Sequence, residues 1–398
     1  MGILDHYKQF EAMPPEEVNA RLREEADERK RRALAIVDPL DLSRTTWPHL
    51  PDSRIVNAIT FAARSGLQGM PERHATPLRT ELALRHRVPP GRVVVGDGAA
   101  ALLSAAAQAL LEPDDELITP WPSYGLYPVM ARRVRARAVP VAGHGVEPIL
   151  AAVNPRTRIV ALCNPNDPTG ELLRVDDLRT LLSALPERVV VLLDEALREF
   201  VDAEPADATL ALLEEHPRLL IFRSFSKAWG LAGLRCGYAL GGPGAEELLS
   251  QLEPDLGVNE LAVAGALEAL RSSAPMIARR VKALATERTS MTDELLARGA
   301  EVTRSQANFL WAAIPGVDGS ELAARLERHG VQVAPGALLG DAARIRVSLL
   351  NPASGDRFLR ALDRSLGRVS PDEAPAAEAA SAPAGAATDA AADAPAQP

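Results

Sequence analysis

Cysteine, aromatic residues and long apolar runs are scarce in this chain of 398 residues. Only two cysteines occur, Cys163 and Cys236, which excludes a disulfide framework, and neither has the spacing of a metal ligand. Both lie in apolar, strand-like runs, so we expect buried free thiols and no bound metal. No apolar run reaches the length of a membrane span, and the start Met1–Asp5 lacks the pattern of a secretory signal. We therefore expect a cytoplasmic protein with no membrane partner.

Positive charge is also in deficit, because the net charge is −9. Five acidic residues follow Arg368, where no lysine or arginine occurs, which leaves −4 for residues 1–368. This balance does not suggest a nucleic-acid partner. Residues 369–398 contain no leucine, isoleucine or aromatic side chain. Such a segment has little to bury, so we expect a disordered tail rich in alanine and proline.

Short apolar runs alternate with helical patterns from about residue 92 to residue 240. This alternation predicts an α/β fold, with a mainly parallel seven-stranded sheet covered by helices on both faces. The expected strands are Arg92–Gly96, Glu116–Thr119, Ala136–Val141, Arg158–Cys163, Val189–Asp194, Leu219–Ser224 and Gly237–Leu240.

After residue 245 the pattern changes to long helices over about 245–298 and then to short strands near 301–303, 309–312, 331–333 and 344–349. This predicts a smaller α+β domain. The expected division is an N-terminal arm that packs on the small domain or a partner (1–45), a large cofactor-binding domain (46–245), an interdomain helix with the small domain (246–368), and the tail (369–398).

The segment Ser224–Arg235 carries the strongest chemical signal, because it places Ser224, Ser226, Lys227 and Arg235 in a short, mostly apolar loop. Burial disfavours the charged form of a lysine, and a neutral amine attacks carbonyl groups. Hydroxyl groups and an arginine suit an anion with several oxygen atoms. The combination predicts a site for an aldehyde that carries a phosphate, for which pyridoxal 5'-phosphate is the obvious candidate.

A second signal is Gly96-Asp97-Gly98-Ala99-Ala100, which ends a strand and opens a helix. Free N–H groups at a helix start favour phosphate, so Gly98, Ala99 and Ala100 are candidates to bind it. The same residues fit a loose dinucleotide fingerprint, which leaves a nicotinamide oxidoreductase as an alternative. That reading requires an acid at the end of the next strand, but Ile118-Thr119-Pro120 stands there.

Three further motifs follow strand candidates, at the sheet edge where α/β proteins bind ligands. Tyr124 lies in the aromatic loop Pro120–Tyr127, where a side chain can stack on a flat ring. Asp167 lies in the turn Asn164–Gly170. Asp194 follows five apolar residues, so its buried carboxylate needs a partner.

Together these motifs resemble those of class I/II pyridoxal-phosphate aminotransferases of fold type I, and they are most similar to the histidinol-phosphate aminotransferase-like branch. The resemblance covers about residues 40–366 and implies that Lys227 forms the covalent link to the cofactor. It also implies that Asp194 pairs with the ring nitrogen, that Tyr124 stacks, and that Ser224, Ser226 and Arg235 hold the phosphate.

The resemblance further implies that Arg346, in Arg344–Ser348, grips a substrate carboxylate with help from Asn308. It implies a homodimer that transfers the amino group of an L-amino acid or related amine to a 2-oxo acid such as 2-oxoglutarate.

Four positions depart from the family pattern. Asp167 replaces an asparagine and Leu197 a tyrosine, both of which contact the cofactor's phenolic oxygen in the family. Met70 replaces a tyrosine and Ala334 an arginine that mark the histidinol-phosphate branch. The altered oxygen contacts keep a lyase, decarboxylase or cyclase on the same fold open as an alternative. A non-catalytic protein of this fold is a further one, which the intact Lys227 argues against.

Overall fold

The computed structural model of the chain describes Arg21, Arg23 and residues 38–368. The expected tail at 369–398 and most of the expected N-terminal arm (1–45) lie outside these residues. The described part contains a seven-stranded sheet, a four-stranded sheet and a two-stranded sheet. No helix in this part is long and apolar enough to cross a membrane.

The large sheet has the strand order β2-β8-β7-β6-β5-β3-β4. Neighbouring strands from β7 to β4 are parallel, whereas β8 is antiparallel to both β7 and β2. The strands are β2 (Val93–Gly96), β3 (Glu116–Trp121), β4 (Arg137–Ala142), β5 (Thr157–Cys163), β6 (Val190–Asp194), β7 (Leu219–Ser224) and β8 (Gly237–Gly241). The predicted α/β fold with a mainly parallel seven-stranded sheet is confirmed.

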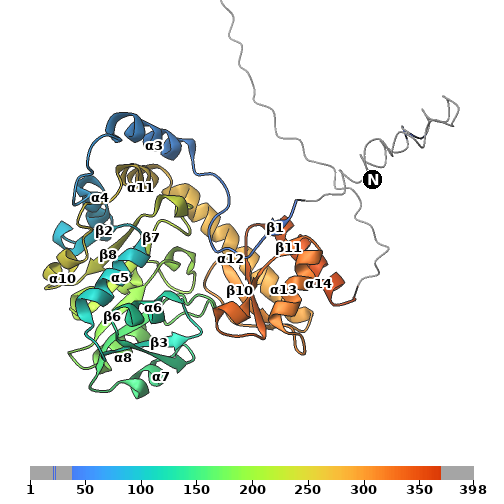
Figure 1. Cartoon of the computed structure of the whole chain (residues 1–398). Helices are drawn as coiled ribbons and strands as arrows, with labels where there is room; N and C mark the ends of the chain where they lie inside the picture. The colour runs from blue at the N-terminus through green and yellow to red at the C-terminus, as the bar shows by residue number, and fades with distance from the viewer. Residues whose placement is uncertain (1–20, 22, 24–37, 369–398) are drawn as a thin grey trace, which may run out of the picture.

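Successive residues of the central strands enter two different cores, because side chains alternate across a sheet. In β6, Leu192 belongs to one apolar cluster and Val191 and Leu193 to the other. Helices cover both faces, as Figure 1 shows. The helices of this part of the chain are α3 (Ser53–Gly66), which packs on α11, and α4 (Thr76–His86), α5 (Ala99–Leu110), α6 (Leu126–Arg133), α7 (Val146–Ala152), α8 (Val175–Ala184), α9 (Leu212–Glu215), α10 (Glu246–Gln251) and α11 (Glu260–Ser272).

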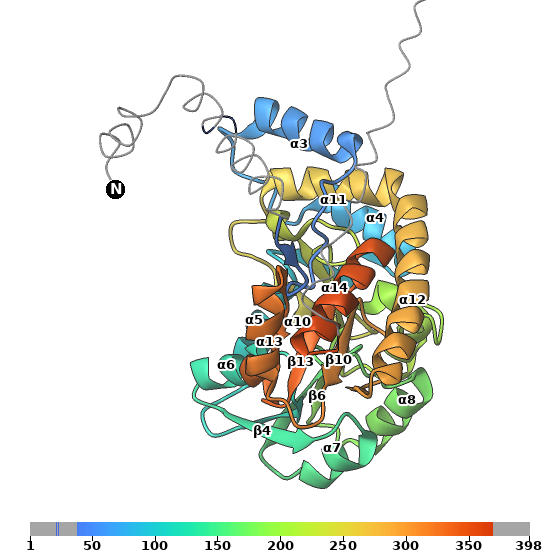
Figure 2. The same cartoon turned by 90° about the vertical axis from the view of Figure 1, so that its right-hand side faces the viewer.

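The long helix α12 (Ala274–Ala297) leads from the large sheet to a second, antiparallel sheet. Figure 2 shows α12 running down one side of the molecule, with α11 lying along α3 at its upper end. The second sheet has the order β12-β13-β10-β9. Its elements are β9 (Glu301–Val302), β10 (Phe309–Ala313), β12 (Ala334–Pro335) and β13 (Arg344–Ser348), with α13 (Gly319–Arg328) and α14 (Pro352–Ser365).

The N-terminal strand β1 (Leu40–Asp41) pairs in parallel with β11 (Val331–Gln332), so the start of the described chain is attached to the smaller sheet region. Our division into domains at 46–245 and 246–368 remains a proposal. It agrees with the change from a parallel to an antiparallel sheet, but it did not anticipate β1.

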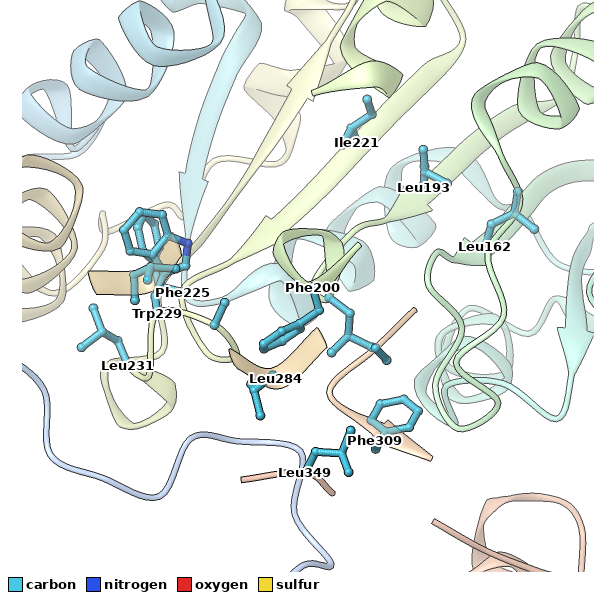
Figure 3. Close-up of a cluster of buried hydrophobic side chains, with 14 of the residues drawn as sticks. Leu162, Leu193, Phe200, Ile221, Phe225, Trp229, Leu231, Leu284, Phe309 and Leu349 are labelled. Atoms are coloured by element: carbon cyan, nitrogen blue, oxygen red, sulfur yellow. The ribbon is translucent and has the colours of Figure 1, made fainter. Parts of the chain in front are cut away.

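One apolar cluster joins the two sheets. Figure 3 shows Phe200 and Leu284 near the small-sheet residue Phe309, with the large-sheet residue Leu193 above them. All four belong to the same buried core, together with Leu231 of the lysine loop. Because burial of apolar surface is the main driving force of folding, this cluster holds the two sheets together.

Gly237 allows β8 to pass close to the start of α5. A Cβ atom at Gly237 would lie 2.4 Å from the backbone nitrogen of Ala99 and 2.9 Å from the carbonyl oxygen of Arg223. Both obstacles are backbone atoms, which cannot move away as a flexible side chain can.

We therefore predict that Gly237→Ala lowers the free energy of unfolding by about 1–3 kcal/mol, measured by urea denaturation. Gly233→Ala is the matched control, because a Cβ atom there meets nothing within 4 Å. The control should stay within about 0.5 kcal/mol of the parent. Equal unfolding midpoints for the two variants would contradict the close approach.

Candidate active site

A cavity lies at the carboxyl edge of the large sheet, where β5, β6 and β7 end in Cys163, Asp194 and Ser224. It encloses about 160 Å³. Its walls are formed by Thr46, Ala99, Ala100, Tyr124, Cys163, Asp167, Asp194, Ala196, Leu197, Ser224, Ser226, Lys227, Ala232 and Arg235. Nine of the twelve predicted site residues therefore line one cavity, because parallel strands bring their carboxyl ends to the same edge.

Lys227 follows β7 in a loop whose side chains Phe225, Ala228 and Trp229 are buried. Burial lowers the pKa of Lys227, and the positive charge of Arg346 also lowers it, whereas the charge of Asp167 raises it. The Nζ atom donates a hydrogen bond to the hydroxyl oxygen of Thr45. The site thus holds an amine with an increased neutral fraction at a defined position, as a nucleophile or proton carrier requires.

The hydroxyl groups of Ser224 and Ser226 lie beside Arg235. The backbone N–H of Ser226 donates to Ser224 Oγ at 3.0 Å, and Arg235 Nη1 lies 3.4 Å from Ser226 Oγ. Arg235 has φ +53°, a left-handed conformation that is unfavourable for a side chain with a Cβ atom. Such strain is typical of functional sites, and here it accompanies a guanidinium at the edge of the cavity.

Gly98 brings this guanidinium to the start of α5. It has φ +89°, and a Cβ atom there would lie 2.7 Å from Arg235 Nη2. Gly98 itself is not among the lining residues, but Ala99 and Ala100 are, and their N–H groups belong to the first turn of α5, which has no partners within the helix. Helix start, hydroxyl groups and arginine therefore converge on one place, which suits a phosphate group.

Asp194 is a buried acid that lines the same cavity. Its Oδ2 atom accepts from the Tyr127 hydroxyl at 3.1 Å, and Oδ1 accepts from the backbone N–H of Ala196 at 3.0 Å. Burial raises the pKa of Asp194 to about 6, although both hydrogen bonds and the charge of Lys227 lower it. A cation bound in the cavity would stabilise its charged form.

Tyr124 lines the cavity and is 38% exposed, so part of its ring is uncovered. It makes an edge contact with Tyr127, with ring centroids 5.7 Å apart. Tyr127 is fully buried and was not among the predicted site residues. Its position three residues after Tyr124, at the beginning of α6, was the available signal for a second aromatic side chain reaching the same strand end.

Asp167 and Arg346 form an ion pair across the gap between the two sheets. Arg346 Nη1 and Asp167 Oδ1 are 2.5 Å apart, and the side chains are only 12% and 14% exposed. The preceding Asn166 is buried and accepts from Ser123 at 2.6 Å, so it points away from the cavity. The predicted substrate-binding arginine is therefore near the cavity, but it already has an anionic partner.

Asn308 directly precedes β10 of the small sheet and contacts the N-terminal segment. Its Nδ2 atom donates to the carbonyl oxygen of Thr45 at 2.9 Å, and its Oδ1 atom has no partner. In this arrangement Asn308 does not line the cavity but positions the segment that does. Its predicted contact with a substrate carboxylate remains a prediction.

Thr45 and Thr46 are site residues that the sequence did not reveal. They belong to an extended segment that the small-sheet region holds, because Ser348 N donates to Leu42 O at 2.9 Å and Arg346 Nη2 donates to Ser43 O at 3.1 Å. This segment crosses to Lys227 from 182 positions earlier in the chain. No local pattern announces such a contact.

A buried ionic layer supports the strand ends from below. Arg223 donates from Nε to Glu195 Oε2 at 2.9 Å, and these two residues adjoin Ser224 and Asp194 in the chain. Glu199 accepts from Trp229 Nε1 at 2.9 Å, which ties the lysine loop to the segment after β6. Removing one partner of a buried pair is costly, so these contacts stabilise the ends of β6 and β7, from which the segments with Asp194 and Lys227 extend.

The residues present fit pyridoxal phosphate. The phosphate cradle, the buried acid whose pKa is raised, the partly uncovered tyrosine ring and the buried lysine all line the same cavity. No cluster of residues in the described part of the chain could hold a metal ion. Cys163 and Cys236 are buried free thiols, as predicted.

Comparison with known proteins agrees with this chemistry. A family model described as aminotransferase class I and II matches residues 34–362. An aromatic amino acid aminotransferase of Corynebacterium efficiens is 37% identical over 332 residues, which cover 81% of this chain and 92% of that protein. A histidinol-phosphate aminotransferase of Nitrosococcus oceani is 35% identical over 300 residues, which cover 74% of this chain and 80% of that protein.

Solved structures show the same architecture. The histidinol-phosphate aminotransferase of Sinorhizobium meliloti, in complex with pyridoxal-5'-phosphate, has a TM-score of 0.74 and 25% identity, and the match covers 84% of this chain and 93% of that chain. Because the family model spans most of the chain, and relatives and fold agree with it, the chain belongs to the class I and II aminotransferases.

Proposed function

We propose that this protein uses pyridoxal 5'-phosphate to transfer the amino group of an L-amino acid with an aromatic side chain to a 2-oxo acid such as 2-oxoglutarate. The observation that carries the proposal is the cavity lined by both Lys227 and the buried Asp194. Burial raises the pKa of Asp194 and lowers that of Lys227, so it favours the neutral form of each group. A positively charged ring beside Asp194 would lower the pKa of that carboxyl group again.

The chain's own residues divide the work. Ser224, Ser226, Arg235 and the start of α5 would hold the phosphate, and Tyr124 would pack against the ring. Asp194 would supply the negative charge for the ring nitrogen. Pyridoxal phosphate supplies the electron-withdrawing ring, which is the chemistry that no amino-acid side chain offers. Lys227 takes the proton from the substrate Cα, for which its lowered pKa is suited.

The substrate class rests on the relatives and on two positions in this chain. The relatives include aromatic amino acid aminotransferases and histidinol-phosphate aminotransferases. Met70 is 74% exposed and has no charge or hydroxyl to offer a phosphate, and Ala334 is equally apolar. Because both replace residues that mark the histidinol-phosphate branch, we favour a donor without a phosphate group.

We predict that Lys227→Ala lowers transamination by at least a thousandfold, since the Cα proton then has no acceptor in place. Borohydride reduction of the parent enzyme, followed by peptide mapping, should find the cofactor on the peptide that contains Lys227. Turnover retained in the variant, or a label on another lysine, would overturn the assignment.

The donor is identified by a screen against 2-oxoglutarate. Phenylalanine, tyrosine and tryptophan should give the highest kcat/KM, with histidine, aspartate and histidinol phosphate as competitors. A preference for histidinol phosphate over all three aromatic amino acids would contradict the proposed substrate class.

A second candidate is an elimination, decarboxylation or cyclisation with the same cofactor. Leu197 lines the cavity without a hydrogen-bond donor, and Asp167 contributes a negative charge instead of an amide. Product analysis separates the two: transamination gives one new amino acid for each 2-oxo acid consumed, whereas the other reactions consume none.

We also propose that the active protein is a homodimer. Large apolar side chains are exposed on α3 and on the loops near it, including Phe61 (74%), Leu67 (71%) and Leu256 (71%). Exposed apolar patches of this kind mark contact surfaces. Light scattering in solution tests the stoichiometry.

The raised pKa of Asp194 leads to a prediction about stability. An acid whose folded pKa is raised from 3.8 to about 6 holds its proton more tightly in the folded state. Below about pH 4 the carboxyl group is protonated, and its contribution to the free energy of unfolding is at its most favourable. This contribution is lost as the pH rises through about 6. In the cofactor-free protein, Asp194→Asn should therefore be more stable than the parent at pH 8, by up to about 3 kcal/mol.

Denaturant unfolding near pH 4 and pH 8 checks this expectation, and the difference should nearly vanish at the lower pH. The cofactor should reverse the order at pH 8, because the variant has lost the charge that pairs with the ring. A cofactor-free variant less stable than the parent at pH 8 would show that burial does not destabilise this carboxylate.

A further inference from the structure

The ion pair between Asp167 and Arg346 occupies the group that the proposed function assigns to the substrate carboxylate. Both terminal nitrogens of Arg346 are engaged, Nη1 with Asp167 at 2.5 Å and Nη2 with the carbonyl oxygen of Ser43 at 3.1 Å. Only Nε is buried without a partner. A substrate carboxylate would add a second anion to a guanidinium that already has one.

The surroundings of Asp167 and Arg346 strengthen the attraction between the two side chains. The side chains of Asp167 and Arg346 are 14% and 12% exposed, so water screens their attraction poorly. Asp167 is held in a turn whose neighbours Asn166 and Thr169 are buried and bonded to each other at 2.9 Å. Its backbone therefore cannot easily withdraw, and only the side chain can rotate away.

Two walls of the site meet in this contact. Asp167 lies in the turn after β5 of the large sheet and lines the cavity, whereas Arg346 lies in β13 of the small sheet. The pair therefore connects the two sheets directly, at a position where a bound substrate would otherwise connect them.

We propose that Asp167 is a specificity-determining residue that acts as an internal carboxylate, competing with the substrate carboxylate for Arg346. The inference rests on the proposed function for its relevance to catalysis, but not for its test. In the parent enzyme the carboxylate contributes little to substrate affinity, and the side chain contributes most. Removing the charge of Asp167 frees Arg346, so every carboxylate ligand binds more tightly.

The test measures binding of two unreactive probes to the holoenzyme by titration calorimetry. The probe 3-phenylpropanoate carries a ring and a carboxylate but no amine, and 3-phenylpropanamide is its neutral analogue. Asp167→Asn should bind the carboxylate about tenfold or more tightly than the parent, with the affinity for the amide changed less than about twofold.

Glu171→Gln is the matched control. It removes the same charge from the same turn region, but Glu171 does not line the cavity. It should bind both probes as the parent does. Asp167→Glu keeps a competing carboxylate and should also bind the propanoate weakly. Adding Arg346→Gln to Asp167→Asn should abolish the gain.

Unchanged or weaker propanoate binding by Asp167→Asn would overturn the proposal, as would an equal gain for the amide. Asp167→Ser serves for the same comparison if the asparagine variant does not fold. The proposed competition for Arg346 and the proposed function can be refuted separately. An active enzyme without the affinity gain refutes the competition and leaves the function, whereas the gain in a protein without transaminase activity refutes the function and leaves the competition.

Discussion

Burial of Asp194 at the end of a parallel strand is the constraint on which the rest of the site depends. The strand β6 lies between β5 and β7 and is apolar up to its last residue, so the carboxylate emerges where the sheet ends and the cavity begins. Burial raises its pKa, and two hydrogen bonds hold it in one orientation. The folded protein thus keeps a carboxylate that a bound cation stabilises, at a cost in its own stability.

Lys227 shows the same principle with the opposite charge. Burial lowers its pKa, and the ionic layer formed by Arg223, Glu195 and Glu199 keeps its loop against the strand ends. Both shifts arise mainly from the removal of water, which outweighs the attraction between Lys227 and the carboxylates of the cavity. The apolar cluster between the two sheets is therefore as important for the chemistry as the polar residues, since it excludes the water that would erase the shifts.

The smaller sheet contributes through contacts that cross between the sheets. Arg346 reaches Asp167, Asn308 holds the backbone of Thr45, and Thr45 accepts from Lys227. These contacts connect β13, the start of β10, the N-terminal segment and the lysine loop. Residues of both sheets therefore form the side of the cavity that is proposed to bind the substrate. The proposed phosphate cradle, by contrast, is formed by the large-sheet region alone. Changes in the small-sheet region should therefore alter specificity more than cofactor affinity.

Much of this arrangement followed from local sequence patterns. The apolar runs that end in Asp194 and Ser224 predicted central strands with the observed ends, because a strand buried on both faces has no polar alternation. The glycines and hydroxyl groups around Lys227 predicted a phosphate-binding loop for similarly local reasons. The antiparallel direction of β8 and the helices α3, α4, α6 and α7 were not predicted. The direction of a strand depends on how the chain returns to the sheet, which its own residues do not encode.

The sequence by itself determined the seven strands of the large sheet and singled out Lys227 and the residue types proposed to bind a phosphate, since each depends on neighbours along the chain. Only the tertiary structure decided that Tyr127 bonds to Asp194, that Thr45 reaches Lys227, and that Asp167 pairs with Arg346. The last two contacts join residues about 180 positions apart. Such contacts depend on how sheets pack against each other, and packing is set by the shape of the whole core rather than by any one segment.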